Sequence, residues 1–416
     1  MDDGARMPRR EFVTRSAGAF GAVAASSLLG AAGATAAPKH SPPGKGRGQL
    51  NLVGMDHVGI TVPDINEAIE WFEDVLGAEA PLTFGPLPAG DFVAGVVDVA
   101  TTTSIDQITE LRIGRSANIE LFKYTAPDGQ RHDMPKNSDW SGHHIAFYVT
   151  DIEAAVDYMK GKGVRRMPAG PFTLTEGPAA GQTIQYFQTP WGGYVEFISY
   201  PKGMAYEGPG VKPLWSPKLN GRKTEVTKVP GLLGIDHIGI TVPDIGQAAA
   251  WLERNLGFTN PLTFGPFSDP KGDFMTELVD VNPRAVVDQI RVLRGGNGPG
   301  VELFQYRSPD QDRSFRINSD WGAHHLAFYV RDIDKAVATL QARAGTKLAG
   351  PIPITEGPAA GQSINYFHTP FGTDVELISY PHGMAYEDAA PVDLWNPRDN
   401  HPARGGRGHW PSKAPP

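Results

Sequence analysis

Hydrophobic and polar residues alternate along several short segments, in the pattern typical of half-buried β-strands. In DHVGITV, residues 56–62, His57, Gly59 and Thr61 share one face, and valine and isoleucine side chains share the other. Four more segments, NIELFKY, YVEFISY, VELFQY and VELISY, are rich in β-branched and aromatic residues and carry one glutamate each. The pattern therefore predicts strands at all of these places.

Between the strands the apolar residues recur at the helical period. INEAIEWFEDVL (65–76) and IGQAAAWLERNL (245–256) each place them along one side and each run into a glycine. Asp64 precedes the first segment and Asp244 the second, with Glu or Gln three residues further on. We expect amphipathic helices that start at these aspartates and stop at the glycines.

The whole pattern occurs twice. GMDHVGITVPDI from residue 54 returns as GIDHIGITVPDI from residue 234, and PLTFGP, NSDW, TEGPAAGQ and GMAYE recur as well. Such self-similarity indicates a duplicated domain. The predicted repeats are residues 51–207 and 232–388, with a Pro/Gly/Lys-rich linker at 208–231 and a Pro/Gly/Arg-rich tail at 389–416.

Each repeat is itself made of two related halves. DHVGITVPDI from residue 56 aligns with HHIAFYVTDI from residue 143, so His57 corresponds to His144 and not to His143. Every half reads as a strand, a helix and three further strands. Four βαβββ modules predict an α+β protein whose strands curl into half-open barrels, with helices packed outside.

A histidine and a glutamate occupy matching positions in every half. The histidine lies on the first strand and the glutamate on the last, where a buried carboxylate is costly unless a cation meets it. Two halves closing face to face would bring two of each together. Nitrogen and oxygen ligands without sulfur suit Fe(II), Mn, Ni, Co or Zn. The eight candidate metal ligands are His57, Glu120, His144, Glu196, His237, Glu302, His325 and Glu376.

Composition limits the partners. The 416 residues include 38 Lys+Arg and 46 Asp+Glu, a net charge of −8, and no long basic run, which argues against nucleic acid. Cysteine is absent, so neither disulfides nor thiolate ligands are available. The expected partner is a small-molecule substrate.

The first 36 residues have the features of a twin-arginine (Tat) signal peptide. Arg9 and Arg10 precede a weakly apolar Ala/Gly segment that ends in the small-residue site Ala34-Thr35-Ala36. We expect export through the Tat translocase to the periplasm or beyond the cell. The segment is too weakly apolar to predict a stable membrane anchor.

Paired βαβββ modules with these histidines and glutamates resemble the vicinal oxygen chelate superfamily, which includes glyoxalase I, methylmalonyl-CoA epimerase, extradiol dioxygenases and the fosfomycin and bleomycin resistance proteins. In that family two modules form a U-shaped cleft with a metal at its base, and substrates chelate it through two neighbouring oxygens. By position the resemblance implies one site from His57, Glu120, His144 and Glu196, and another from His237, Glu302, His325 and Glu376. His143 and His324, on the opposite strand face, are then expected to be buried or to support the ligands.

The resemblance implies alternative reactions. In glyoxalase-like members a metal-bound glutamate, here Glu120 or Glu302, takes a proton beside a carbonyl. In extradiol dioxygenases two histidines and one glutamate hold iron and leave room for O₂. By position those triads would be His57, His144 and Glu196, and His237, His325 and Glu376.

The runs YFQTPWGGYVE and YFHTPFGTDVE are similar to the extradiol motif, with Tyr186 and Tyr366 at the place of its catalytic tyrosine. That family's upstream acid–base histidine has no counterpart here. Export disfavours the cytosolic thioester and glutathione substrates of the glyoxalase group, so the interpretation leans to an Fe(II)-dependent dioxygenase. A non-catalytic, drug-sequestering protein is the third alternative, and eight metal ligands argue against it.

Overall fold

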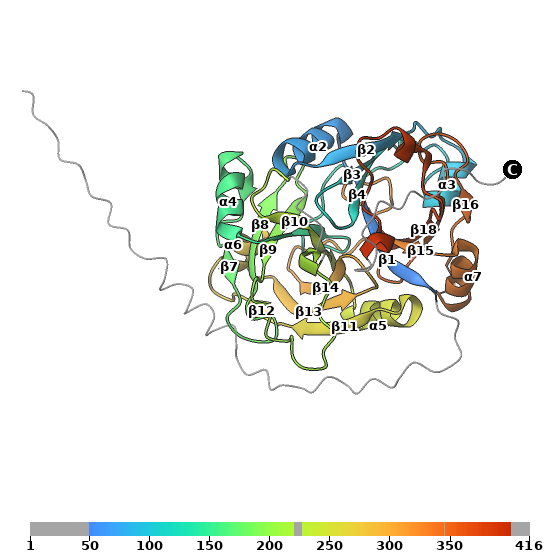
Figure 1. Ribbon diagram of the computed structural model, residues 1–416. Coiled ribbons are helices and arrows are strands. Elements are labelled where there is room, and N and C mark those ends of the chain that lie inside the picture. The colour runs from blue at the N-terminus through green and yellow to red at the C-terminus, as the bar shows by residue number, and fades with distance from the viewer. Residues whose placement is uncertain (1–49, 220–226, 345, 401–416) are drawn as a thin grey trace, which may run out of the picture. The chain divides into compact units, whose positions relative to one another are not determined.

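Two curled β-sheets form the centre of the protein, and each sheet combines half of the first repeat with half of the second (Figure 1). The structure is a computed structural model that describes residues 50–219, 227–344 and 346–400. The predicted signal peptide, part of the linker and the end of the tail lie outside the described residues. The architecture is the predicted α+β fold, with two half-barrel sheets.

The first sheet has eight strands in the order β16-β17-β18-β15-β1-β4-β3-β2. Its strands from the first repeat are β1 (Leu52–Thr61), β2 (Glu79–Phe84), β3 (Ser104–Arg112) and β4 (Asn118–Thr125). Its strands from the second repeat are β15 (His324–Val330), β16 (Ile352–Pro353), β17 (Ser363–Phe367) and β18 (Asp374–Ser379).

The second sheet has ten strands, eight of them in the order β11-β13-β14-β10-β5-β9-β8-β6, with β12 on β13 and β7 on β8. From the first repeat it takes β5 (His143–Val149), β6 (Arg165–Arg166), β7 (Phe172–Thr173), β8 (Thr183–Gln188) and β9 (Tyr194–Ser199). From the second repeat it takes β10 (Leu232–Thr241), β11 (Thr259–Phe264), β12 (Phe267–Ser268), β13 (Val286–Arg294) and β14 (Gly300–Arg307).

The helices lie on the outside of the sheets (Figure 1). The four that follow the first strand of a half are α2 (Ile65–Trp71, continued by a π-helical turn, Phe72–Leu76), α4 (Ile152–Gly161), α5 (Ile245–Leu256) and α7 (Ile333–Ala344). Two short helices that the sequence did not predict are α3 (Asp91–Val97) and α6 (Phe274–Val279). Short 3₁₀ turns lie at Pro217–Leu219, Ala385–Asp388 and Pro397–Asn400.

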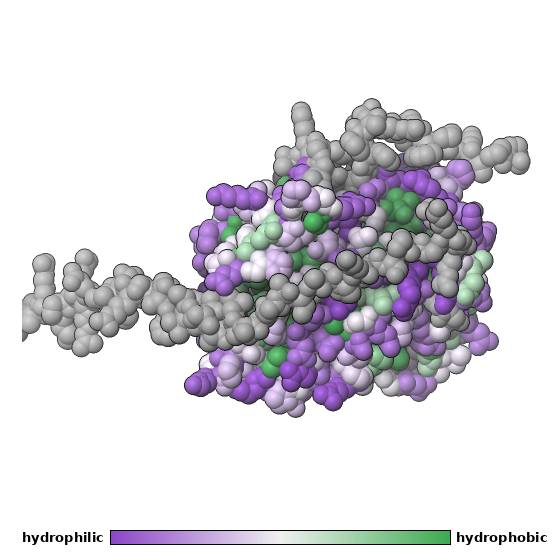
Figure 2. All heavy atoms as spheres, turned by 90° about the horizontal axis from the view of Figure 1, so that it is seen from below, coloured by the Kyte–Doolittle hydropathy of each residue, from purple (hydrophilic) through white to green (hydrophobic). Residues whose placement is uncertain are grey.

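The predicted helix ends are confirmed. The Asp64 carboxylate accepts from the backbone N–H groups of Asn66 and Glu67, and Asp244 accepts from that of Gln247. Gly77 and Gly257 end the helical segments with φ of 78° each, a left-handed conformation that glycine adopts without strain. No helix among the described residues is long and apolar enough to cross a membrane. The face drawn in Figure 2 is mainly hydrophilic, with small apolar patches.

The way in which the halves pair differs from the prediction. Strand β1 runs antiparallel to β15 from the other repeat, with Gly59 opposite His325, and β10 pairs in the same way with β5, with Gly239 opposite His144. The halves of one repeat therefore do not share a sheet. The local sequence could not decide this, because HHIAFYV of β5 and HHLAFYV of β15 offer β1 almost the same partner.

The two halves of one repeat meet through their helices and loops instead. Trp71 of α2 packs edge-on against Trp191, with ring centroids 5.6 Å apart, and Trp251 of α5 packs against Phe371, with ring centroids 5.8 Å apart. A single buried apolar cluster draws on residues of both sheets and of these helices. The two sheets thus share one core on the faces opposite the candidate metal ligands.

Candidate metal centres

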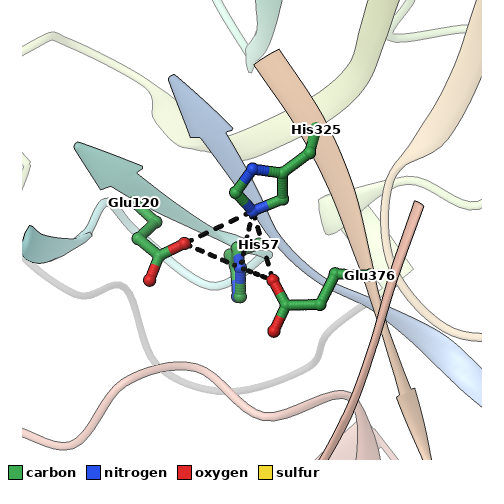
Figure 3. A group of neighbouring side chains, drawn as sticks. All are labelled: His57, Glu120, His325 and Glu376. Carbon is green, nitrogen blue, oxygen red and sulfur yellow. Dashed lines mark hydrogen bonds and ion pairs between the residues drawn. The ribbon is translucent and has the colours of Figure 1, made fainter. Parts of the chain in front are cut away.

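Four buried side chains converge in the first sheet, in a group here called site 1 (Figure 3). Neighbouring strands supply them in the order Glu376 on β18, His325 on β15, His57 on β1 and Glu120 on β4. His57 Nε2 lies 3.1 Å from Glu120 Oε2 and 3.3 Å from Glu376 Oε2. His325 Nε2 lies 3.3 Å and 3.2 Å from the same two oxygens, and 3.4 Å from His57 Nε2.

The second sheet holds the equivalent group, here called site 2. It consists of Glu302 on β14, His237 on β10, His144 on β5 and Glu196 on β9. His237 Nε2 lies 3.0 Å from Glu302 Oε2 and 3.9 Å from Glu196 Oε2, and His144 Nε2 lies 3.6 Å and 3.2 Å from them. All eight predicted ligands are therefore buried at two centres, but the predicted grouping by repeat was wrong.

The predicted three-ligand sets, each taken from one repeat, were wrong for the same reason. His57 lies with His325 and Glu376, and His237 lies with His144 and Glu196. The reason is the strand pairing described above: the two histidines of one site stand on the two central strands of one sheet, and those strands come from different repeats.

The donor set fits a metal ion. The His57 Nδ1–H donates to Asp56 Oδ1 at 3.1 Å, which leaves the Nε2 of a neutral ring as a lone-pair donor facing two carboxylate oxygens. Glu120 Oε2 and His237 Nε2 are fully buried and make no well-directed hydrogen bond. Ligands about 2.1 Å from a common ion lie about 3.0–3.4 Å apart, close to the 3.0–3.9 Å observed between nitrogen and carboxylate oxygen.

The charges at both sites favour bound positive charge. Burial lowers the pKa of His57, but the charge of Glu120 and the hydrogen bond to Asp56 outweigh it, so the net pKa lies well above its usual value. Burial raises the pKa of Glu376, but hydrogen bonds from His325 and His57 outweigh it and bring the pKa to about 2. Glu376 is therefore ionised, and protons compete with a metal ion for the histidines.

Two aspartates accept hydrogen bonds from two of the ligand histidines, His57 and His237. Asp56 and Asp236 each accept a hydrogen bond from Nδ1 of the histidine that follows, at 3.1 Å in both cases. The hydroxyls of Tyr380 and Tyr200 donate to the other carboxylate oxygen of Asp56 and Asp236 respectively. Such partners fix the tautomer and orientation of a metal-binding imidazole. The Asp-His pair recurs in both repeats, which is the signal in the sequence that could have pointed to these aspartates.

Two glycines make room for the other two histidines. A Cβ atom added at Gly59 would lie 1.9 Å from His325 Cε1, and one added at Gly239 would lie 2.0 Å from His144 Cε1. Each ring therefore lies directly over the backbone of the opposite strand. The glycine of the DHVGITV pattern is thus part of the site, a role that the alternation of the strand did not reveal.

The two tyrosines that match the extradiol motif lie beside the ligands. The Tyr186 hydroxyl is 3.2 Å from His144 Nε2, and the Tyr366 hydroxyl is 3.4 Å from His325 Nε2. Burial raises the pKa of both phenols well above the usual value, so both are neutral at neutral pH. They can donate a hydrogen bond into their sites, and their catalytic role stays a prediction.

The other members of the twin histidines lie elsewhere. The rings of His143 and His324 contact each other in a tilted arrangement with their centroids 4.4 Å apart, and His324 Nε2 is 3.1 Å from the Thr373 hydroxyl. Both are buried, and burial lowers the pKa of His143 to about 4. They are neutral packing residues, as their strand face predicted.

Comparison with known proteins identifies the family. A sequence profile of the Glyoxalase/Bleomycin resistance protein/Dioxygenase superfamily matches residues 56–184 and 236–366. The chain therefore belongs to this superfamily and contains its domain twice. The predicted membership and tandem arrangement are confirmed.

Two relatives carry the name of an epimerase. A 2-epi-5-epi-valiolone epimerase from Actinomyces sp is 44% identical over 162 residues, which make up 39% of this chain and 87% of that protein. The mitochondrial methylmalonyl-CoA epimerase of Homo sapiens is 30% identical over 117 residues, 28% of this chain and 58% of that protein. Among solved structures, glyoxalase I from Zea mays is 14% identical, with a TM-score of 0.46 over 79% of this chain and 92% of that one.

Proposed function

We propose that the protein is a metal-dependent epimerase or isomerase that moves a proton at a carbon next to a metal-chelating oxygen. One observation carries the proposal: each site has two buried carboxyl groups, and they come from the strands that flank the two histidine-bearing strands. In site 1 these are Glu376 and Glu120, on β18 and β4. A reaction that removes a proton from one face of a carbon and returns one to the other face can use two carboxyl groups: an ionised one accepts the proton, and the second, after taking up a proton from solvent, donates it.

Glu120 and Glu302 are in the ionised state that proton abstraction requires. The pKa of Glu120 is lowered, because the charge of His57 and the close contacts with His325 and His57 outweigh the effect of burial. The pKa of Glu302 is lowered to about 2, because His237 and His144 outweigh burial in the same way. Each can accept a proton from a substrate carbon through its carboxylate oxygen. A bound divalent ion would supply Lewis-acid polarisation of the substrate oxygens.

The relatives support the same class of reaction. The Actinomyces protein that shares 44% identity over 87% of its length is named an epimerase, and so is the human one.

Solvent deuterium tests the proposal without a known substrate. The metal-reconstituted protein, incubated in D₂O with a panel of α-hydroxyketones and 1,3-dicarbonyl compounds, should catalyse exchange at the carbon beside the carbonyl. The double variant Glu120→Gln/Glu302→Gln should lose about 10²–10⁴-fold of the rate. Metal content measured on the same samples separates loss of the base from loss of the ion. Full exchange in that variant would contradict the proposal.

Fe(II)-dependent ring cleavage is the second candidate, and the position of Tyr186 and Tyr366 beside a ligand histidine favours it. With this chemistry, catechol-dependent O₂ uptake should be seen on an oxygen electrode and should fall sharply in Tyr186→Phe/Tyr366→Phe. Glu→Gln at 120 and 302 should then leave substantial activity, since a fourth protein ligand occupies space that substrate must take. The two candidates therefore predict opposite responses to the same variants.

The ion and the location complete the proposal. Elemental analysis should find a divalent metal, with Fe(II) expected for ring cleavage and Mn, Ni, Co or Zn equally suited to proton transfer. A sequestering protein without catalysis would purify without stoichiometric metal. Export through the Tat translocase predicts that Arg9→Lys/Arg10→Lys keeps the precursor inside the cell, which fractionation would show.

A further inference from the structure

We infer that site 1 accepts a compact, mainly apolar molecule that carries its chelating oxygens at one end and one additional hydrogen-bond donor. The inference rests on the proposed metal site, but not on which reaction occurs there. It comes from the pocket that opens over His57, Glu120 and Glu376 and encloses about 580 Å³, including the part open to solvent.

The wall of this pocket is almost entirely hydrocarbon. Of the seventeen residues that line it, twelve are Val, Leu, Ile or Phe, among them Val93, Ile108, Phe122 and Ile364. A ligand that fills this space gains from burying apolar surface, at about 25 cal/mol per Å². A polar surface of the same size would lose its hydration without replacement.

The pocket offers no counter-charge for an anionic ligand. None of its lining residues is Lys or Arg, and its carboxylates belong to the candidate metal ligands Glu120 and Glu376. A phosphate or a second carboxylate placed here would be buried next to hydrocarbon and near two negative groups. This excludes phosphorylated thioesters and other multiply charged molecules from the inner pocket.

One polar atom in the wall lacks a partner. Gln362 is only 6% exposed, lines the pocket, and its Oε1 makes no hydrogen bond within the described part of the chain. A hydroxyl or amine on the ligand could donate a hydrogen bond to Gln362 Oε1. That buried hydrogen bond would favour binding, because the oxygen is otherwise without a partner. Tyr366, the remaining polar residue, already lies beside His325. A ring with a hydroxyl on every carbon would therefore leave most of them unpaired.

The short helix α3 forms one wall and the entrance. Val93, Val96 and Val97 face the pocket, and Phe92 also lines it while remaining 54% exposed. An aromatic side chain exposed at the rim gives the pocket an apolar mouth, which favours entry of an apolar body. The corresponding positions beside site 2 carry larger residues, with Phe267 for Leu87, Met275 for Val93 and Leu278 for Val96.

Matched catechols test the inference by binding. Chain loaded with Zn(II), which has no redox chemistry, is titrated calorimetrically with 4-tert-butylcatechol and with 3,4-dihydroxybenzenesulfonate, which chelate alike but differ in their far end. One of the two sites in each chain, site 1, should bind 4-tert-butylcatechol at least tenfold more tightly than it binds the sulfonate. Equal binding, or tighter binding of the sulfonate, would overturn the inference. Failure to retain Zn(II), measured beforehand, would instead overturn the metal site itself.

Residues borrowed from site 2 provide the control variants. Leu87→Phe/Val93→Met/Val96→Leu should reduce the affinity for 4-tert-butylcatechol at least tenfold and leave that for unsubstituted catechol unchanged. The converse triple, Phe267→Leu/Met275→Val/Leu278→Val, should leave site 1 unaffected. Gln362→Leu should reduce the affinity for 5-tert-butylpyrogallol, which has a third hydroxyl, without reducing the affinity for 4-tert-butylcatechol. No change for either compound would overturn the role given to Gln362.

Discussion

Site 1 and site 2 hold the same four ligands in the same strand order, but their surroundings differ. Glu110 of β3 stands opposite Glu120, close enough to Asp56 and His57 to form a further acidic group, and the residue in that register beside site 2 is Val292. The walls differ as well, since Leu87 and Val93 are replaced by Phe267 and Met275. The four ligands are therefore the same at the two sites, whereas the residues behind the ligands and the residues that line the ligand space both differ.

The largest expected difference between the sites follows from removing a ligand. His57→Ala and His325→Ala should each empty site 1 and leave site 2 filled, so that metal content falls from about two ions per chain to about one. Elemental analysis of the reconstituted variants measures this. His144→Ala serves as the matched control because it should empty site 2 although it lies in the same repeat as His57. Loss of the same ion from His57→Ala and His144→Ala would contradict the cross-repeat pairing.

Gly59→Ala and Gly239→Ala should have the next largest effect. The added methyl group would lie within 2.0 Å of a ligand imidazole, so the ring must leave its position and the strands must shift, at a cost of about 1–3 kcal/mol in unfolding free energy. Each variant should also lose metal from its own site only. Gly161→Ala at the end of α4 meets nothing within 4 Å, so it should keep both ions and should raise the free energy of unfolding by at most about 1 kcal/mol. Thermal unfolding with and without metal would show both effects.

Asp56→Asn and Asp236→Asn should weaken metal binding by about 10–100-fold without abolishing it, because the histidine keeps its position but loses the carboxylate that orients its proton. The effect should be alike at the two sites, since both contacts are 3.1 Å long. Competition with a chromophoric chelator gives the two affinities. A loss of affinity at site 2 alone would show that Glu110 replaces part of the function of Asp56 at site 1.

Glu110→Val makes site 1 resemble site 2 and should alter metal affinity less than the Asp variants. Burial raises the pKa of Glu110 well above its usual value, which favours the neutral carboxyl, so its removal should change the charge of the site less than loss of a ligand glutamate would. The same chelator competition measures the result. Loss of the site 1 ion in this variant would make Glu110 a ligand.

His143→Ala and His324→Ala should keep both ions. These rings touch each other and not the metal ligand atoms, so the variants should lower the free energy of unfolding by about 1–3 kcal/mol through lost packing. Denaturant unfolding and metal analysis on the same samples separate the two outcomes. If these variants lost as much metal as His144→Ala, His143 and His324 would have to be ligands as well, contrary to their assignment.

The sequence was sufficient to predict the βαβββ modules and the eight candidate metal ligands. Strand alternation placed His57 and Glu120 on inward faces, and the Asp64 and Asp244 caps set the helix starts. It was insufficient for the partner of β1, because β5 and β15 present almost identical sequences and the choice depends on long-range packing. Helices α3 and α6 were also missed, since each is shorter than two helical turns and gives too short a window for the helical period.

The pairing of β1 with β15 and of β10 with β5 has a consequence for a chain cut between its repeats, for example by a protease acting near Pro209. Neither fragment would carry a whole site, because every site takes one histidine and one glutamate from each side of the cut. The two pieces would have to stay together as a heterodimer, joined by two continuous sheets and by any ions bound between them. Chelation would then loosen the nicked protein into its fragments, whereas the uncut chain would lose only its metal.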